Sequence, residues 1–170
     1  VLIYIFAPAK LNNLNLSFEN CLFSNNFLNL PGAIFVQISY GTTKIFLKNC
    51  VFQYSRTNLS LIRSSVPLYI DGIKIGIQAF LENCLFLNNK FSAIGAITAI
   101  NSFIFCYQTT FFNTSASYMI GLFLLDTSSL FLKKTDIKMF GAPLAGICYA
   151  RDSFVNFTDC DLVGGIALFS

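Results

Sequence analysis

Apolar and polar residues alternate in short runs along this chain, and similar runs return every 25 to 34 residues. The plainest copies lie at 17–23, 47–52 and 81–86 and share an Asn-Cys pair with a Phe two residues after the Cys. Weaker copies lie at 106–111, 132–137 and 157–162. Alternation with a period of two predicts strands with one buried face, and a recurring unit of this length predicts stacked repeats.

Two columns of residues emerge when the copies are aligned. An anchor column holds Cys or Thr, and a second column, two residues later, is apolar in every copy. We expect both columns to point into one interior, together with apolar positions three and five residues before the anchor. The anchor column is Cys21, Cys50, Cys84, Thr109, Thr135 and Cys160, and the second column is Phe23, Phe52, Phe86, Phe111, Ile137 and Leu162.

A corner residue directly precedes each anchor. The inward positions are spaced by two within a strand but by three across the step to the anchor, so one residue there must form a bend. Asn tolerates the left-handed backbone region better than other non-Gly residues, so it suits a sharp bend between two short strands. The corner residue is Asn20, Asn49 or Asn83 in the clear copies and Asp159 in the last. The remaining copies have Gln108 and Lys134 instead, and we expect their corners to differ.

A third strand follows in each repeat after a loop of variable length. Gly and two small or apolar residues mark it at 32–34, 95–97, 121–123, 146–148 and 165–167, and residues 66–70 are its equivalent in the second repeat. Three short strands per repeat predict an all-β right-handed parallel β-helix of about six coils, with residues 1–170 in a single domain. The rival is an antiparallel sandwich or barrel, but hairpin signals are scarce because the chain has no Asn-Gly pair.

Composition narrows the partners that such a fold could have. Hydrophobic residues make up 55% of the chain, yet no run reaches the ~20 apolar residues that a membrane span needs. The net charge of +3 comes from scattered Lys and Arg, which argues against nucleic acid as a partner. With no His and no Cys-x-x-Cys pair, we expect no zinc site and no cofactor. We assign most of the 20 Phe to inward columns and interpret them as core rather than as a sugar-binding surface.

The six Cys pose a choice between thiols and disulfides. Cys21, Cys50 and Cys84 should stack with Cα atoms about 4.8 Å apart, which a disulfide allows. Parallel side chains are poorly aimed at each other, and a buried free Cys behaves as a small hydrophobe. We therefore favour a ladder of free thiols, with disulfides as the alternative.

Catalytic chemistry has few candidate residues in this chain. Only eight residues are acidic, and the one cluster is Asp136 with Asp159 and Asp161. Asp136 and Asp161 occupy one column and should face outward, where paired carboxylates could bind calcium or simply form a solvated rim near lysines. A polysaccharide lyase would need a basic residue beside an acidic groove, and no Arg has such a neighbour along the chain. We expect the protein not to be an enzyme.

Four Asn-x-Ser/Thr sequences are candidate glycosylation sites in a secreted protein. Asn58 and Asn113 lie in predicted loops and are the better candidates. Asn15 and Asn156 lie on predicted strands, with their own side chains pointing outward.

Two short motifs suggest a family. Phe-x-Asn-Asn occurs at 23–26 and at 86–89. Each copy is followed by Gly-Ala-Ile, at 32–34 and at 95–97. These motifs resemble the repeats of polymorphic outer membrane proteins and related pectin-lyase-like β-helix proteins of protists. The resemblance implies an extracellular passenger or surface region used for adhesion. Pectin-lyase-like proteins also include polysaccharide-cleaving enzymes, so it equally admits a carbohydrate-binding or carbohydrate-cleaving role.

The strongly apolar stretches at 1–6 and 166–169 bear on assembly. A β-helix exposes unpaired backbone at each end and therefore needs a cap or a neighbour. We expect either a fragment or mature piece of a longer repeat protein, or copies that associate through their ends into a filament. The favoured hypothesis is a non-catalytic structural or adhesive protein located outside the cell or on its surface, with glycans as further partners. The alternatives are the carbohydrate role and a passenger region of a larger adhesin.

Overall fold

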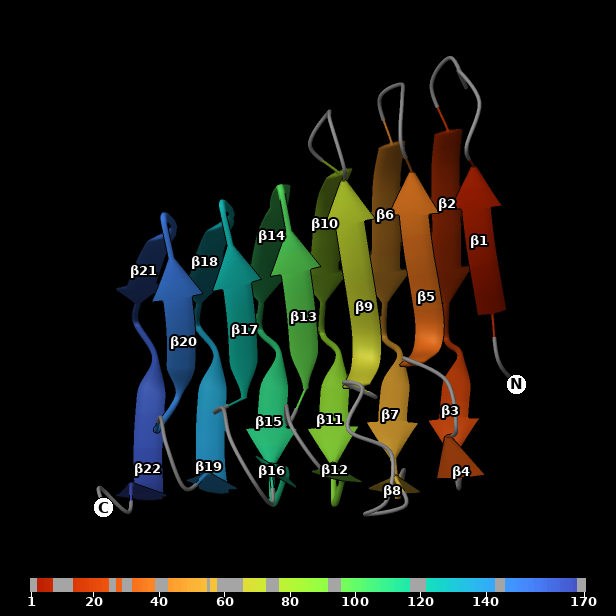
Figure 1. The fold of residues 1–170 in the computed structure, drawn as a ribbon. Coiled ribbons are helices and arrows are strands. Elements are labelled where there is room, and N and C mark those ends of the chain that lie inside the picture. The colour runs from red at the N-terminus through yellow and green to blue at the C-terminus, as the bar shows by residue number, and fades with distance from the viewer. Residues whose placement is uncertain are drawn as a thin grey trace.

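The computed structural model contains parallel β-sheets wound into a solenoid (Figure 1). It describes residues 3–7, 14–24, 27–28, 32–38, 43–54, 56–57, 66–72, 77–91, 96–116, 122–142 and 146–167. Within these ranges every regular element is a strand, and every strand pair is parallel. None of them contains a helix with the length and apolarity needed to cross a membrane. The all-β parallel β-helix predicted from the repeat is confirmed.

Two of the sheets have six strands each. Sheet 1 contains β1 (Ile3–Ala7), β5 (Gly32–Ile38), β9 (Val66–Gly72), β13 (Ile97–Ile100), β17 (Phe123–Asp126) and β20 (Cys148–Arg151). Sheet 2 contains β2 (Leu14–Glu19), β6 (Thr43–Lys48), β10 (Ile77–Glu82), β14 (Ser102–Tyr107), β18 (Ser129–Lys133) and β21 (Phe154–Thr158).

Sheet 3 has two branches that merge toward the C-terminal end of the solenoid. One branch contains β3 (Leu22–Ser24), β7 (Val51–Gln53), β11 (Leu85–Leu87) and β15 (Thr110–Phe112). The other contains β4 (Phe27–Leu28), β8 (Arg56–Thr57), β12 (Lys90–Phe91) and β16 (Ser115–Ala116). Both branches join on β19 (Asp136–Ala142), which also pairs with β22 (Asp161–Ala167).

The chain passes from sheet 1 to sheet 2 to sheet 3 and back, and advances by one strand per turn. In Figure 1 it rises along the front strands, descends along the strands behind them and advances to the left, which makes the winding right-handed. Within the described residues, four turns carry four strands each and two further turns carry three. The second bend is the bend that separates the two branches of sheet 3, and β19 and β22 run through it unbroken. The arrangement differs from the predicted three strands per coil because two-residue strands such as β4 and β8 are too short to show alternation.

The predicted columns superimpose along one interior. The register pairs Phe23 with Phe52, Phe52 with Phe86 and Phe86 with Phe111, and it continues through Ile137 to Leu162. The first four form a stack of rings with centroids 4.7 Å apart at each step. The remaining core residues come from the inward positions of sheets 1 and 2, such as Ile34, Ile45 and Ile97. Burial of a side chain of this size contributes about 1.5–3 kcal/mol, so the ladder is a main source of stability.

The corner residues before the anchors all adopt the left-handed backbone region. Their φ values lie between 49° and 55° in Asn20, Asn49, Asn83, Gln108, Lys134 and Asp159. The expectation that Gln108 and Lys134 form different corners is wrong. The bend is imposed by the strands on either side and by the inward residue that follows, so a long polar side chain takes the same conformation at an energetic cost.

Residues 165–167 do not form the third-strand equivalent that their Gly marker predicted. They belong to β22 in sheet 3, where Ile166 pairs with Gly141 and Ala167 with Ala142. The last repeat has no loop between the two segments, so the strand that starts at Asp161 continues straight through them. The other marked segments whose residues are described lie in sheet 1, as predicted.

Candidate functional site

The anchor column is a ladder of small hydrogen-bond donors inside the solenoid. Cys50 Sγ lies 3.4 Å from the carbonyl oxygens of Phe18 and Lys48, one on the preceding turn and one two residues earlier. Thr109 Oγ1 makes the same pair of contacts with Leu81 and Tyr107 at 3.5 and 3.3 Å. Thr replaces Cys in this column because both donate to carbonyl groups that the bend leaves inside the core.

The Cys side chains in the described residues are free thiols, which agrees with the favoured thiol ladder. Burial raises the pKa of Cys84 and of Cys148 to about 12 and also raises the pKa of Cys50 and Cys106. Because the thiolate is the nucleophilic form, these groups are poorly reactive at neutral pH. The arrangement assigns the buried thiols a structural role.

The predicted acidic cluster is organised by a lysine. Asp136 and Asp161 occupy paired positions on β19 and β22, as predicted. Lys138 Nζ lies 3.4 Å from Asp136 Oδ2 and 3.1 Å from Asp161 Oδ2. The hydrogen bond to Asp161 and the charge of Asp136 raise the pKa of Lys138. The ammonium group thus occupies the position between the carboxylates that a calcium ion would take.

Asp159 does not join this pair. It is an exposed corner residue with φ 52°, and no three acidic, Cys or His residues in the described ranges are grouped so that they could hold a metal. Arg151 forms a separate exposed ion pair in sheet 1, where its Nε donates to Asp126 Oδ1 at 3.0 Å and its Nη2 donates to Asp126 Oδ2. The hydrogen bond from Arg151 lowers the pKa of Asp126. Asp126 and Arg151 occupy paired positions on β17 and β20, and sequence reasoning missed them because it aligned only the inward residues of that strand.

The glycosylation candidates fall in three settings. Asn113 is exposed at a corner between β15 and β16, with φ 47°. Asn15 and Asn156 are exposed on β2 and β21 of sheet 2, so their side chains do face outward. Asn58 lies outside the described residues. Whether any of these residues carries a glycan stays a prediction.

A second phenylalanine ladder lies on the outer face of sheet 2. Its ring centroids are 5.2 Å apart between Phe46 and Phe80 and 5.0 Å apart between Phe103 and Phe131. The interpretation of Phe chiefly as core is therefore wrong for this sheet, where β6, β10, β14 and β18 carry Phe on the outer face. Phe46 and Phe80 are stacked, whereas the contacts among Phe80, Phe103, Phe131 and Phe154 are tilted by 33° to 49°, so the rings do not form one flat face for a sugar.

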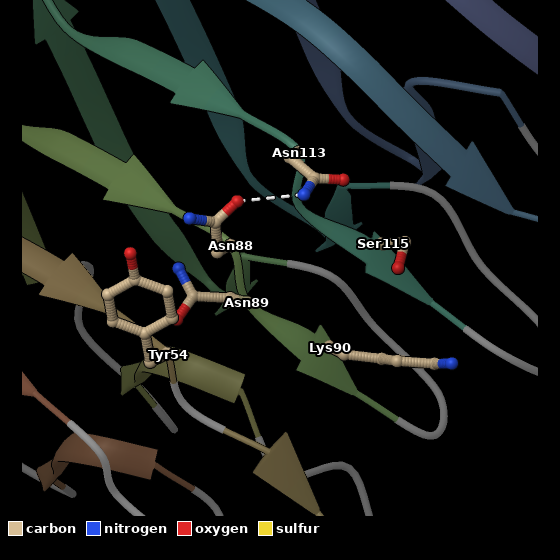
Figure 2. Close-up of a pocket in the computed structure, with 6 residues that line it drawn as sticks. All are labelled: Tyr54, Asn88, Asn89, Lys90, Asn113 and Ser115. Carbon is tan, nitrogen blue, oxygen red and sulfur yellow. Dashed lines mark hydrogen bonds between the residues drawn. The ribbon is translucent and has the colours of Figure 1, made fainter.

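A shallow pocket of about 270 Å³ opens at the second bend of the solenoid (Figure 2). Its lining is polar and comes from three consecutive turns: Tyr54, Asn88, Asn89, Lys90, Asn113 and Ser115. Asn113 Nδ2 donates to Asn88 Oδ1 at 2.7 Å, and Asn89 Nδ2 donates to the carbonyl oxygen of Phe52 at 2.8 Å. Sequence reasoning named Asn113 as a glycosylation candidate and Asn88 and Asn89 within a repeat motif, but it did not bring them together because the pocket depends on a bend that the alternation does not reveal.

The last turn of the solenoid exposes residues of the inward columns. Phe157 is 40% exposed, whereas Leu132, its partner in the preceding turn, is 1% exposed. Leu162 is 45% exposed, whereas its partner Ile137 is fully buried. Among the described strands, β20, β21 and β22 each have a parallel partner on one side only.

Comparison of the chain with models of protein families, with curated proteins and with solved structures finds no match. What is established is therefore the fold itself, a parallel β-solenoid, together with the geometry of the sites above.

Proposed function

We propose that this chain is a non-catalytic structural or adhesive β-helix protein, acting outside the cell or on its surface, that stacks head to tail. The exposed cross-section of the last turn carries the proposal. A partner for that surface must supply a parallel strand edge and an apolar interior of the same outline. The first turn of another copy has both.

The matching of columns makes the stacking specific. Continuation of the register would place Phe18 of the next copy on Phe157, Phe23 on Leu162 and Cys21 on Cys160. Phe18 and Cys21 are half-buried, unlike their equivalents in the central turns. An interface between two different surfaces of identical subunits repeats without closing and yields a filament.

The resemblance of the repeat motifs to polymorphic outer membrane proteins and pectin-lyase-like β-helix proteins supports an extracellular adhesive setting. The exposed Asn residues in glycosylation sequences are compatible with secretion. In the alternative, a passenger region of a larger adhesin, further turns of the same polypeptide would take the place of the second copy.

Cross-linking between end cysteines tests the stacking. In a head-to-tail stack, Cys160 and Cys21 of neighbouring copies should lie about 4.8 Å apart at Cα. A short thiol–thiol cross-linker should then give a ladder of covalent oligomers on a denaturing gel, and electron micrographs should show rods of variable length. Buried Cys50, Cys84 and Cys106 should react far more slowly.

Three single variants make the test specific. Cys21→Ser and Cys160→Ser should each abolish the covalent ladder, since each removes one side of the junction. Cys148→Ser is the matched control, because Cys148 is half-buried in the same last turn but continues a column that begins at Ile3. A chain that sediments as a monomer and yields no intermolecular cross-link would contradict head-to-tail stacking.

A further inference from the structure

We propose that Asn156 carries an N-linked glycan whose first sugar packs on Phe154 and covers the C-terminal end of the outer phenylalanine ladder. The inference rests on the proposed location outside the cell, since such glycans are added to secreted proteins. It does not depend on head-to-tail stacking. It also reverses the order expected from the sequence, which favours Asn58 and Asn113 as the glycosylated residues.

The outer face of β21 presents the parts of this site side by side. Phe154, Asn156 and Thr158 are spaced by two along the strand, so their side chains share one face, and all three are exposed. Thr158 Oγ1 donates a hydrogen bond to Asn156 Oδ1 at 3.1 Å. The hydroxyl that the glycosylation sequence requires is therefore in contact with the Asn that accepts the sugar, and an aromatic residue follows on the other side.

The modification is a group transfer to the amide of Asn156. Its donor is an oligosaccharide joined through a pyrophosphate group to a lipid, which the secretory route of a eukaryotic cell supplies. The bond between C1 of the first sugar and the pyrophosphate oxygen breaks, C1 bonds to Asn156 Nδ2, and Nδ2 loses one proton. The lipid pyrophosphate is the leaving group. The product keeps Asn156 Oδ1 as the acceptor for the Thr158 hydroxyl.

Phe154 gives the first sugar an apolar surface to pack on. Its side chain is 53% exposed, and its ring meets that of Phe131 at a centroid distance of 5.4 Å with planes at 44°. A tilted contact covers less of the ring than a stacked one would. The ladder offers no flat platform to a free sugar, but a sugar tethered at Asn156 needs one ring only, against which its C–H groups can pack.

The position of Asn156 in the sheet directs the glycan toward the ladder. Asn156 is the register partner of Phe131, so its side chain leaves sheet 2 directly beside that ring. Phe154 is more exposed than Phe46 toward the other end of the ladder, which is 41% exposed. Exposed apolar surface promotes unwanted association, and a glycan at this point would cover it. Because the glycan leaves from the face of the sheet, the edge of β21 stays open for pairing.

The other three glycosylation sequences lack this arrangement. The residues two positions before their Asn are Asn13, Arg56 and Phe111, of which only the last is aromatic. Phe111 is 1% exposed within the inner ladder, so it offers no ring to a sugar on Asn113. Asn113 Nδ2 also donates to Asn88 Oδ1 at 2.7 Å, so the nitrogen that would take the sugar already has a partner. Asn156 alone has an exposed aromatic side chain at the position before it on the same face.

Secretion of the full chain from a eukaryotic cell line tests the modification. Mass spectrometry of the glycopeptides measures occupancy in the cell extract and in the medium, so that retained chains are counted too. Asn156 should be occupied in most chains and more fully than Asn113. Thr158→Ala should abolish the glycan on Asn156, whereas Thr158→Ser keeps the hydroxyl and should retain it. An Asn156 that is unoccupied, or less occupied than Asn113, would overturn the inference.

Enzymatic trimming tests the packing on Phe154, in a chain whose other three glycosylation sequences are removed. One sample is cut back to the first sugar by an endoglycosidase, and another is freed of all sugar by an amidase. The trimmed chain should unfold at a temperature at least about 2 °C above that of the sugar-free chain. Phe154→Val should remove this difference, whereas Phe46→Val makes the same change elsewhere on the ladder and should preserve it. A difference that persists in Phe154→Val, or none in the parent chain, would contradict the packing.

Failure of this inference and failure of the proposed function can be told apart. Occupancy in the secretory host reports on the site at Asn156 itself. A natural chain without the glycan, despite occupancy in that host, would contradict the location outside the cell. Head-to-tail stacking is measured independently by the cross-link between Cys21 and Cys160.

Discussion

Two ladders of phenylalanine rings run along the solenoid, one inside it and one on the outer face of sheet 2. Inside, Phe23, Phe52 and Phe86 stack with centroids 4.7 Å apart and planes within 9° of parallel. Outside, the paired rings of Phe46 and Phe80 are 5.2 Å apart with planes at 12°, whereas the diagonal contact from Phe80 to Phe103 is 6.4 Å with planes at 49°. The inner rings are register partners at every step and are enclosed on all sides. The outer contacts include diagonal ones between residues that are not paired, such as Phe80 with Phe103, and they rest on one sheet only.

The difference shows that one residue type serves two purposes in this chain. The inner ladder is fully desolvated and defines the cross-section of the rod. The outer ladder is partly exposed, with Phe46 41% and Phe154 53% accessible, and adds apolar surface to a sheet that is already complete. Perturbation of the inner ladder should therefore cost far more stability than perturbation of the outer one.

Phe86→Ala should have the largest effect of the single substitutions considered. The side chain is fully buried between Phe52 and Phe111, so its removal leaves a cavity that neighbouring turns cannot close. We expect the free energy of unfolding to fall by about 3–5 kcal/mol, measured by denaturant titration. A loss below about 1 kcal/mol would show that the rings do not form a closed stack.

Substitutions at the corners should rank second, since the bends orient both ladders. Asn83→Val places a β-branched residue at φ 50° and should cost about 1–2 kcal/mol. Lys134→Asn is the opposite test, because it puts the preferred residue at a corner with the same φ and should stabilise the chain. Both changes are read from thermal unfolding, and destabilisation by Lys134→Asn would contradict the shared corner geometry.

Phe80→Ala on the outer ladder should cost less than Phe86→Ala on the inner one. It removes a half-buried ring and its contacts with Phe46 and Phe103, worth about 0.5–1.5 kcal/mol beyond the area lost. The measurement is the same denaturant titration as for Phe86→Ala. Equal losses at the two positions would remove the distinction between the ladders.

Acidification should give the smallest effect, through the exposed pair of Asp126 and Arg151. Because the folded pKa of Asp126 is lowered, its stabilising contribution is present above the ordinary Asp pKa of about 3.9 and is lost as pH falls through the folded value. Solvent screens this pair, so the loss is slight and salt reduces it further. A comparison of acid unfolding in the parent chain and in Arg151→Gln measures it, and a larger acid-induced loss in the variant would contradict the pairing.

Much of the fold could be predicted because the inward columns have a strong period-two signal and a repeated anchor. The outer ladder could not, because β14 carries Phe103, Phe105 and Tyr107 on its outer face and alternation there no longer distinguishes inside from outside. The corners at Gln108 and Lys134 were missed for another reason. Their conformation is imposed by the strands that flank them and by the inward donor that follows, Thr109 or Thr135, not by the corner residue itself.

The sites depend more heavily on the third dimension. Asp136 and Asp161 could be placed together because they share a column, yet the position of Lys138 between them depends on side-chain direction. The pocket at the second bend joins Tyr54, Asn88 and Asn113 from three turns, and only register brings them together. A regular rule appears once the bends are known: a left-handed residue is followed by an inward Cys, Thr, Ser or Asn.

Contacts between phenylalanine rings test the central claim, that the columns stack turn upon turn around one interior. In a chain labelled at Phe, nuclear Overhauser effects should join the ring protons of Phe23 to Phe52, Phe52 to Phe86 and Phe86 to Phe111, in keeping with centroids 4.7 Å apart. Absence of these three contacts, or a direct contact between Phe23 and Phe86, would contradict the stacked solenoid.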